Sequence, residues 1–258
     1  MPGTELLQQI LPVSAFAFML VFARVGAILM LVPGIGESFV NPRVRLSIAL
    51  AVTLLLAPSV AHSLPPMPAS PLQGFVLLLG ETVVGLFIGG AARLTLSGLQ
   101  VASTVITYQS GLGFAQFYDP TQGGQGALVA SFLNMVGLTA IFAANLHLLM
   151  LRATADSYIL FPPAALPPLG DFARMTVAIV AGSFRLGIQI AAPFIVYGLV
   201  LNVGLGVLNR LMPQIQVSMV AMPLQIGAAF VLLAVTLGSI TLWFLQYYQT
   251  AVSPFLVQ

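Results

Sequence analysis

Apolar residues gather in six long stretches, which are separated by short segments rich in Pro, Gly and polar residues. The stretches run over about residues 13–32, 44–61, 72–108, 126–151, 176–208 and 217–245. Each is close to or longer than the ~20 residues that a helix needs to cross a bilayer. None shows the period-2 alternation of a half-buried strand. The pattern predicts an all-α, membrane-associated fold of long apolar helical hairpins.

The links between the stretches are too short and too apolar to separate two domains, so we expect a single domain over residues 1–258. Arginines in these links carry a weak orientation signal. Arg152 and Arg174 lie in the fourth link. The odd-numbered links are counted with Arg43, Arg45, Arg93 and Arg210, because the apolar run of the third stretch ends at Gly90 and only its helix is expected to continue past Arg93. This distribution favours cytoplasmic odd-numbered links, with both termini on the other side.

The composition agrees with a membrane location. Only 5% of the residues are charged, whereas a soluble domain carries about 25%. So few charges cannot cover a globular surface in water, which excludes a soluble enzyme. The net charge of +2 comes without a basic patch in the sequence, so we expect no nucleic-acid partner. The absence of Cys excludes disulfides and thiolate metal sites.

Three ionisable residues lie inside apolar stretches, where a charge costs ~2.5–3.5 kcal/mol by insertion scales: Arg24, Glu81 and Arg185. One interpretation is an ion or proton relay. The other is a set of buried charges that pair with one another or contact a partner subunit. A single acid makes a poor proton path, so we favour the second interpretation.

Catalytic and metal-binding patterns are absent from the sequence. His62 and His147 have no His, Cys or carboxylate at ligand spacing. The chain has no HExxH, GxSxG or P-loop motif. We therefore expect neither enzymatic activity nor a cofactor or metal.

The segment at residues 109–126 differs from the rest, because five Gly and four Gln surround two Phe and one Tyr. Irregular backbone at membrane depth survives only inside protein or beside a water-filled cavity. One interpretation is a surface loop with aromatic anchors. The other is a flexible constriction that fills a pore, in which Gly gives mobility and Phe excludes water. Composition alone leaves both open.

Four blocks of sequence carry a resemblance to a known family. They are GLGFAQFYDP (111–120), FARVGAILMLVPGIG with NPRVRL (22–36 and 41–46), ETVVGLFIG (81–89) and NVGLGVLNRLMPQIQV (202–217). In this order and spacing the chain resembles the FliR family of flagellar biosynthetic proteins, whose injectisome counterparts are the SctT-type export proteins. The resemblance extends from about Ala15 to Trp243. The chain departs from the pattern at Leu146, where a small residue is expected before His147.

The resemblance implies a core subunit of the flagellar type III export gate in the bacterial inner membrane, at the flagellar basal body. Such proteins resemble a FliP-like part fused to a FliQ-like part. They assemble with FliP- and FliQ-type subunits into a helical pore complex beside FlhA- and FlhB-type proteins. Unfolded flagellar subunits pass through this pore. Apolar helices would then face sister subunits as well as membrane lipid.

The resemblance also implies roles for particular residues. A loop that plugs the closed gate maps onto residues 109–124, and its expected plug residues are Gly111, Gly113, Phe114, Phe117, Tyr118, Asp119 and Pro120. The link between the fifth and sixth stretches resembles a subunit contact, formed by Arg210, Pro213 and Gln214. The alternative from a different class is a stand-alone secondary permease, which would need several intramembrane carboxylates.

Overall fold

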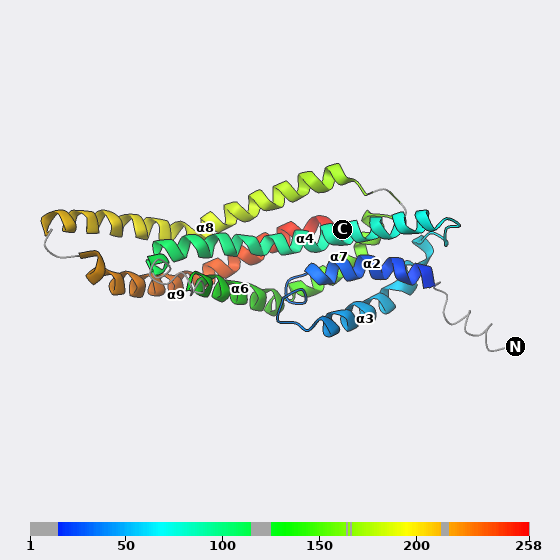
Figure 1. The fold of residues 1–258 in the computed structure, drawn as a ribbon, viewed down its shortest axis with the longest axis horizontal. Coiled ribbons are helices and arrows are strands. Elements are labelled where there is room, and N and C mark those ends of the chain that lie inside the picture. The colour runs from blue at the N-terminus through cyan, green and yellow to red at the C-terminus, as the bar shows by residue number, and fades with distance from the viewer. Residues whose placement is uncertain (1–14, 115–124, 164, 166, 213–216, 258) are drawn as a thin grey trace. The chain divides into compact units, whose positions relative to one another are not determined.

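The computed structural model describes residues 15–114, 125–163, 165, 167–212 and 217–257. Seven α-helices occur in this part of the chain (Figure 1): α2 Ala15–Leu31, α3 Pro42–Val60, α4 Pro71–Gln109, α6 Gln125–Ala143, α7 Leu146–Leu160, α8 Leu169–Leu211 and α9 Val217–Val252. Three short 3-10 helices accompany them: η1 Ala61–Ser63, η2 Leu112–Phe114 and η3 Ser253–Phe255. The described residues contain no strand. The predicted all-α fold of long apolar helices is confirmed.

Four helices are long and apolar enough to cross a membrane, and a bent pair provides a fifth candidate. The bent pair is α6 and α7, which are separated by a short break that includes Asn145. The sequence pattern predicts one continuous stretch over residues 126–151, but the helix breaks at Asn145, which adopts a left-handed φ of 57°. Asn tolerates this conformation better than most residues because its short amide can bond to local backbone.

The described residues fall into two compact units. Unit 1 contains the chain up to Arg93, together with Asn145–Val177 and the end of the chain from Thr250. Unit 2 contains Leu94–Ala144 and Ala178–Gln249. Three helices, α4, α8 and α9, continue from one unit into the other, so the two units are not separate along the chain. The single domain over residues 1–258 stays a prediction.

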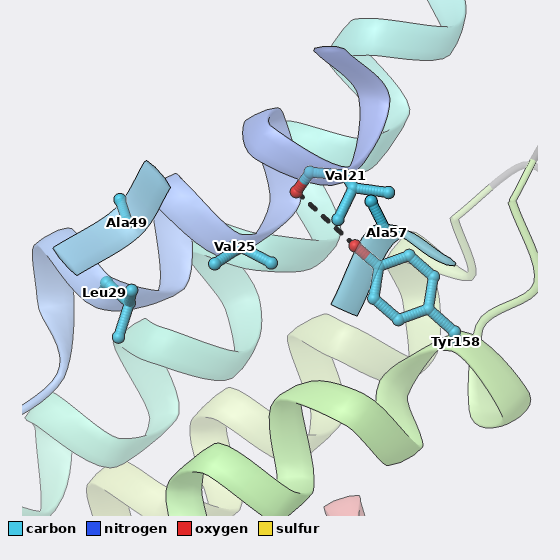
Figure 2. Close-up of a cluster of buried hydrophobic side chains, with 6 residues drawn as sticks. All are labelled: Val21, Val25, Leu29, Ala49, Ala57 and Tyr158. Carbon is cyan, nitrogen blue, oxygen red and sulfur yellow. Dashed lines mark hydrogen bonds between the residues drawn. The ribbon is translucent and has the colours of Figure 1, made fainter. Parts of the chain in front are cut away.

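In unit 1, a stripe of small residues lets α3 pack against α2. Ala49, Thr53 and Ala57 recur every four residues, so they lie on one face of α3, and all three are buried. Figure 2 shows Ala49 and Ala57 beside the α2 residues of this cluster. Other faces of α3 stay exposed, including those that carry Leu50, Leu54 and Leu55.

Two glycines bring α4 close to α2 in the same unit. A Cβ on Gly85 would lie 2.5 Å from the Arg24 carbonyl oxygen, and one on Gly89 would lie 2.7 Å from that of Ile28. Any side chain at either position would therefore collide with backbone. The G-x-x-x-G spacing places both glycines on one face of α4 and permits this close approach.

Glycines play a similar part in unit 2. A Cβ on Gly98 of α4 would lie 2.9 Å from the carbonyl oxygen of Ser183 on α8. Between the same two helices, Ser183 Oγ donates to the Leu94 carbonyl (2.9 Å). The Tyr247 hydroxyl of α9 donates to the Ile179 carbonyl of α8 (2.6 Å). These bonds satisfy polar groups between closely packed apolar helices of this unit.

Candidate functional site

A buried ion pair connects two helices of unit 1. Arg24 Nε on α2 donates to Glu81 Oε2 on α4 at 2.6 Å, and the two side chains are only 1% and 4% exposed. Gly85 lies one turn beyond Glu81 and allows the close approach of α4 to the Arg24 backbone. The two residues that sequence reasoning placed among the buried charges therefore meet and neutralise each other.

The same guanidinium caps the end of α7. Arg24 Nη1 donates to the carbonyl oxygen of Ser157 (2.9 Å) and to its hydroxyl (3.3 Å), and Nη2 donates to the Phe161 carbonyl (2.9 Å). Phe161 is the residue at which α7 ends. The Ser157 carbonyl also accepts from the Phe161 N–H (2.9 Å), so the guanidinium is a second donor there. The carbonyl end of a helix carries partial negative charge, so a cation at this end is favourable. Arg24 therefore ties α2, α4 and α7 together.

Tyr158 completes this cluster. Its ring lies 4.2 Å from Arg24 Cζ, in the geometry of a cation–π contact. Its hydroxyl donates to the Val21 carbonyl at 3.5 Å, a contact that Figure 2 shows among the buried apolar side chains. The site thus offers the charge three kinds of compensation: a carboxylate, backbone carbonyls and an aromatic face.

Arg185 was the third charge placed inside an apolar stretch, and the chain by itself does not bury it. Arg185 is exposed on α8 together with Phe184 and Ile188. Ser183 and Leu186 occupy the buried face of the helix instead. The helical period therefore turns Arg185 outward, where a contact with a partner subunit stays a prediction.

In unit 2, the glycine-rich segment begins with a turn that only glycine adopts without strain. α4 ends at Gln109, and Gly111 has a φ of +80°. A Cβ on Gly111 would lie 3.1 Å from Cδ of Gln225, and one on Gly113 would lie 2.9 Å from the Tyr108 ring. Conformation and space both favour glycine at Gly111.

Gln225 of α9 holds this turn in place. Its Nε2 donates to the Gln109 carbonyl at 3.1 Å, and its own carbonyl accepts from the Tyr197 hydroxyl of α8 at 2.7 Å. The Gln109 side chain in turn lies against Gly198 of α8. Hydrogen bonds and packing therefore connect the end of α4 to both α8 and α9 within unit 2.

Of the remaining predicted site residues, two lie in the described part of the chain. Phe114 closes η2 by its backbone, and Arg210 is exposed in the last turn of α8. Six others lie outside the described residues: Phe117, Tyr118, Asp119, Pro120, Pro213 and Gln214. Within the described part of the chain, no group of three His, Cys, Asp or Glu side chains could hold a metal ion.

Sequence reasoning missed Ser157, Tyr197 and Gln225 as members of these clusters. Their partners are far away along the chain, and no local spacing reports such contacts. Gln225 carried the clearest available signal, because it is an amide inside a stretch that is otherwise apolar enough to span a membrane.

Comparison with known proteins identifies the family. The sequence profile described as "Bacterial export proteins, family 1" matches residues 15–251. The chain is 41% identical over 238 residues to the flagellar biosynthetic protein FliR of Caulobacter vibrioides, a match that covers 92% of this chain and 94% of that protein. The chain belongs to the FliR family.

More distant FliR proteins match over similar lengths. FliR of Pectobacterium carotovorum is 31% identical over 84% of this chain and 82% of its own length. FliR of Bacillus subtilis is 28% identical over 87% of each chain. The resemblance read from the four sequence blocks is confirmed. This FliR-family chain is a membrane component of the flagellar export apparatus.

Proposed function

We propose that this chain is a core subunit of the flagellar type III export gate in the bacterial inner membrane. In this proposal it forms, with FliP- and FliQ-type proteins, the pore through which unfolded flagellar subunits are exported. It acts without catalysing a reaction itself. Family membership gives the context, and the exposed apolar face of α8 in unit 2 is the observation that carries the role of a subunit.

That face is a continuous stripe. Val196, Leu199, Val200, Val203 and Val207 are each at least 55% exposed, and they follow the i, i+3, i+4, i+7, i+11 spacing of one helix face. We call these five residues the α8 stripe. An apolar stripe of this length is typical of a helix that packs against another helix.

Two glycines near the stripe favour a protein neighbour over lipid alone. Cβ atoms on Gly204 and Gly206 would meet no described atom within 4 Å. Glycine weakens a helix by about 1 kcal/mol relative to Ala unless packing or a close approach uses it. The two glycines lie two residues apart and therefore flank the stripe on opposite sides. Partner helices that approach the backbone on either side would use one glycine each and cover the stripe.

The loop at residues 109–124 is the proposed luminal plug. Gly111, Gly113, Phe114 and Phe117 are its plug residues, and Tyr118, Asp119 and Pro120 fix its far end. The anchored turn at Gly111 supports this assignment, because a plug must be attached to a rigid wall at its base. Gln225 and Tyr197 supply that attachment in unit 2.

Native mass spectrometry tests the gate assignment. The chain is co-expressed with FliP-, FliQ-, FlhA- and FlhB-type proteins and extracted in a mild non-ionic detergent. We expect one large hetero-oligomer that contains this chain with FliP- and FliQ-type subunits. A stable monomer or homodimer would contradict the proposal and favour a stand-alone secondary permease.

A deletion tests the plug separately. Removal of residues 111–117 should leave the hetero-oligomer intact but make the resting membrane permeable to small ions. Replacement of the same residues by seven Gly/Ser residues controls for the length of the loop and should also leak, because it removes the aromatic seal. An assembled deletion variant whose membrane stays tight would refute the plug.

A further inference from the structure

The positive charge of unit 1 is concentrated at one place. Its described residues include six Arg and four acids, and three Arg–acid pairs lie elsewhere: Arg24 with Glu81, Arg152 with Asp156, and Arg174 with Asp171. What remains is Arg43, Arg45 and Arg93 against Glu37 alone. We call these three arginines the arginine patch.

Two arginines of the patch contact the loop between α2 and α3, and Arg43 follows that loop in the first turn of α3. The Arg45 guanidinium donates to the carbonyls of Glu37 (2.6 Å) and Val40 (2.9 and 3.1 Å), so backbone rather than a carboxylate holds it. Arg93 reaches the same loop from α4, with Nη1 3.5 Å from the Gly36 carbonyl and 3.6 Å from Glu37 Oε1. One carboxylate therefore stands against three cations.

Two of the three arginines are accessible. The Arg93 side chain is 43% exposed, whereas that of Glu37 is only 9% exposed. Arg43 is exposed, and among the described residues its side chain has no hydrogen-bond or ion-pair partner. The surface offers donors for an anion while its single acid points inward.

An apolar track begins directly beside Arg43. Leu46, Leu50 and Leu54 follow at i+3, i+7 and i+11, on the same face of α3, and all three are exposed. From Leu46 to Leu54 the track is about 12 Å long at the 1.5 Å rise of a helix. Phe39, in the loop, is also exposed at 68%.

We infer that the arginine patch and this track on α3 bind an anionic phospholipid, with its headgroup at the patch and an acyl chain along Leu46, Leu50 and Leu54. Charge complementarity requires an anionic group, and the adjoining apolar track distinguishes a lipid from a free phosphate. Arginine suits a phosphate because its planar fork donates two parallel hydrogen bonds. This inference does not depend on the proposed pore or plug.

Lipid titration by native mass spectrometry tests the site. The full chain is extracted in non-ionic detergent with whatever proteins remain bound, and dioleoyl-phosphatidylglycerol or dioleoyl-phosphatidylethanolamine is added. We expect the wild-type chain to retain phosphatidylglycerol preferentially. Arg43→Gln should weaken this binding about fivefold, and Arg43→Gln with Arg93→Gln roughly thirtyfold, from about 1 kcal/mol per arginine. Higher salt should weaken wild-type binding as well.

The matched control is Arg152→Gln with Arg174→Gln, which removes the same charge from exposed arginines outside the patch. It should bind phosphatidylglycerol within twofold of the wild type. Arg43→Gln also guards against misfolding, because that exposed side chain makes no hydrogen bond or ion pair among the described residues that folding could lose.

Three outcomes would overturn the inference. The first is equal retention of both lipids by the wild-type chain. The second is an equal loss of phosphatidylglycerol in the patch and control variants. The third is unchanged lipid binding in the patch variant together with the loss of a co-purifying protein, which would make the patch a protein interface instead.

Discussion

The Arg24 guanidinium contacts most of the buried polar groups that link the helices of unit 1. Arg24 compensates Glu81, caps α7 through Ser157 and Phe161, and packs over Tyr158. A charge in such surroundings is costly when its partner is lost and inexpensive when the pair stays complete. At the residue scale, the fold therefore depends on the integrity of the pair rather than on either charge alone.

Glu81→Gln should lower the stability of the chain by about 3–5 kcal/mol, because it leaves the Arg24 charge buried without its carboxylate. The double substitution Arg24→Gln with Glu81→Gln should recover part of this loss, since no uncompensated charge remains. Thermal unfolding of the detergent-solubilised protein measures both effects. Arg174→Gln, at an exposed pair, is the control and should be near neutral. Equal stability of Glu81→Gln and the control would contradict the structural role.

Gly111→Ala should cost about 1–2 kcal/mol, since an L-residue is strained at a φ of +80°. Gly238→Ala is the matched control, because a Cβ there meets nothing within 4 Å and the position is helical. The control should be neutral or stabilising by up to about 1 kcal/mol. Chemical or thermal unfolding measures the stability of both variants. Identical stabilities would argue against strain at this turn.

At the scale of the elements, glycine positions decide how closely the helices approach. The apolar runs of the sequence suffice to predict where the helices lie, because burial in lipid or protein needs long apolar segments. They could not predict the break at Asn145, which one residue's backbone conformation creates. Nor could they pair Arg24 with Glu81, 57 residues apart, or Gln225 with Gln109, 116 apart. Such contacts belong to the packing of elements, which a single sequence does not state.

Gly85→Ala should weaken the α2–α4 contact, because the added Cβ would lie 2.5 Å from a backbone oxygen that cannot move alone. Overpacking of this kind costs about 1–3 kcal/mol. Gly90→Ala, five residues later in α4, has its nearest non-local neighbour at 4.0 Å and should be tolerated. Apparent melting temperatures and the yield of monodisperse protein compare the two. A Gly85→Ala variant as stable as Gly90→Ala would refute the close approach.

At the scale of the whole molecule, much of the apolar surface is left uncovered by the chain itself. In an apolar 18-residue segment of each of the helices α8 and α9, only 22% of the residues are buried. Family membership was predictable from four sequence blocks. Which residues of α8 would form the exposed α8 stripe was not. Hydropathy reads an apolar residue in the same way whether it faces its own chain, a lipid or another subunit.

Leu199→Glu with Val203→Glu should prevent incorporation of the chain into the export assembly, because two charges would be buried in the proposed contact of the α8 stripe. Leu199→Met preserves volume and apolarity and should assemble normally. Co-purification with FliP- and FliQ-type proteins measures the difference. Full incorporation of the double glutamate variant would show that the stripe faces lipid or solvent instead.

The cap that Arg24 places on α7 has a consequence for biogenesis. Ribosomes add about 5–20 residues per second, so Glu81 follows Arg24 after roughly 3–11 seconds and Ser157 after roughly 7–27 seconds. During that interval α2 carries an uncompensated charge, which costs ~2.5–3.5 kcal/mol at the centre of an inserted helix. We therefore expect α2 to enter the bilayer more readily once α4 has emerged and can supply Glu81. A fragment that stops short of Glu81 would keep this charge uncompensated, so we expect such a fragment to insert less well than one that includes α4.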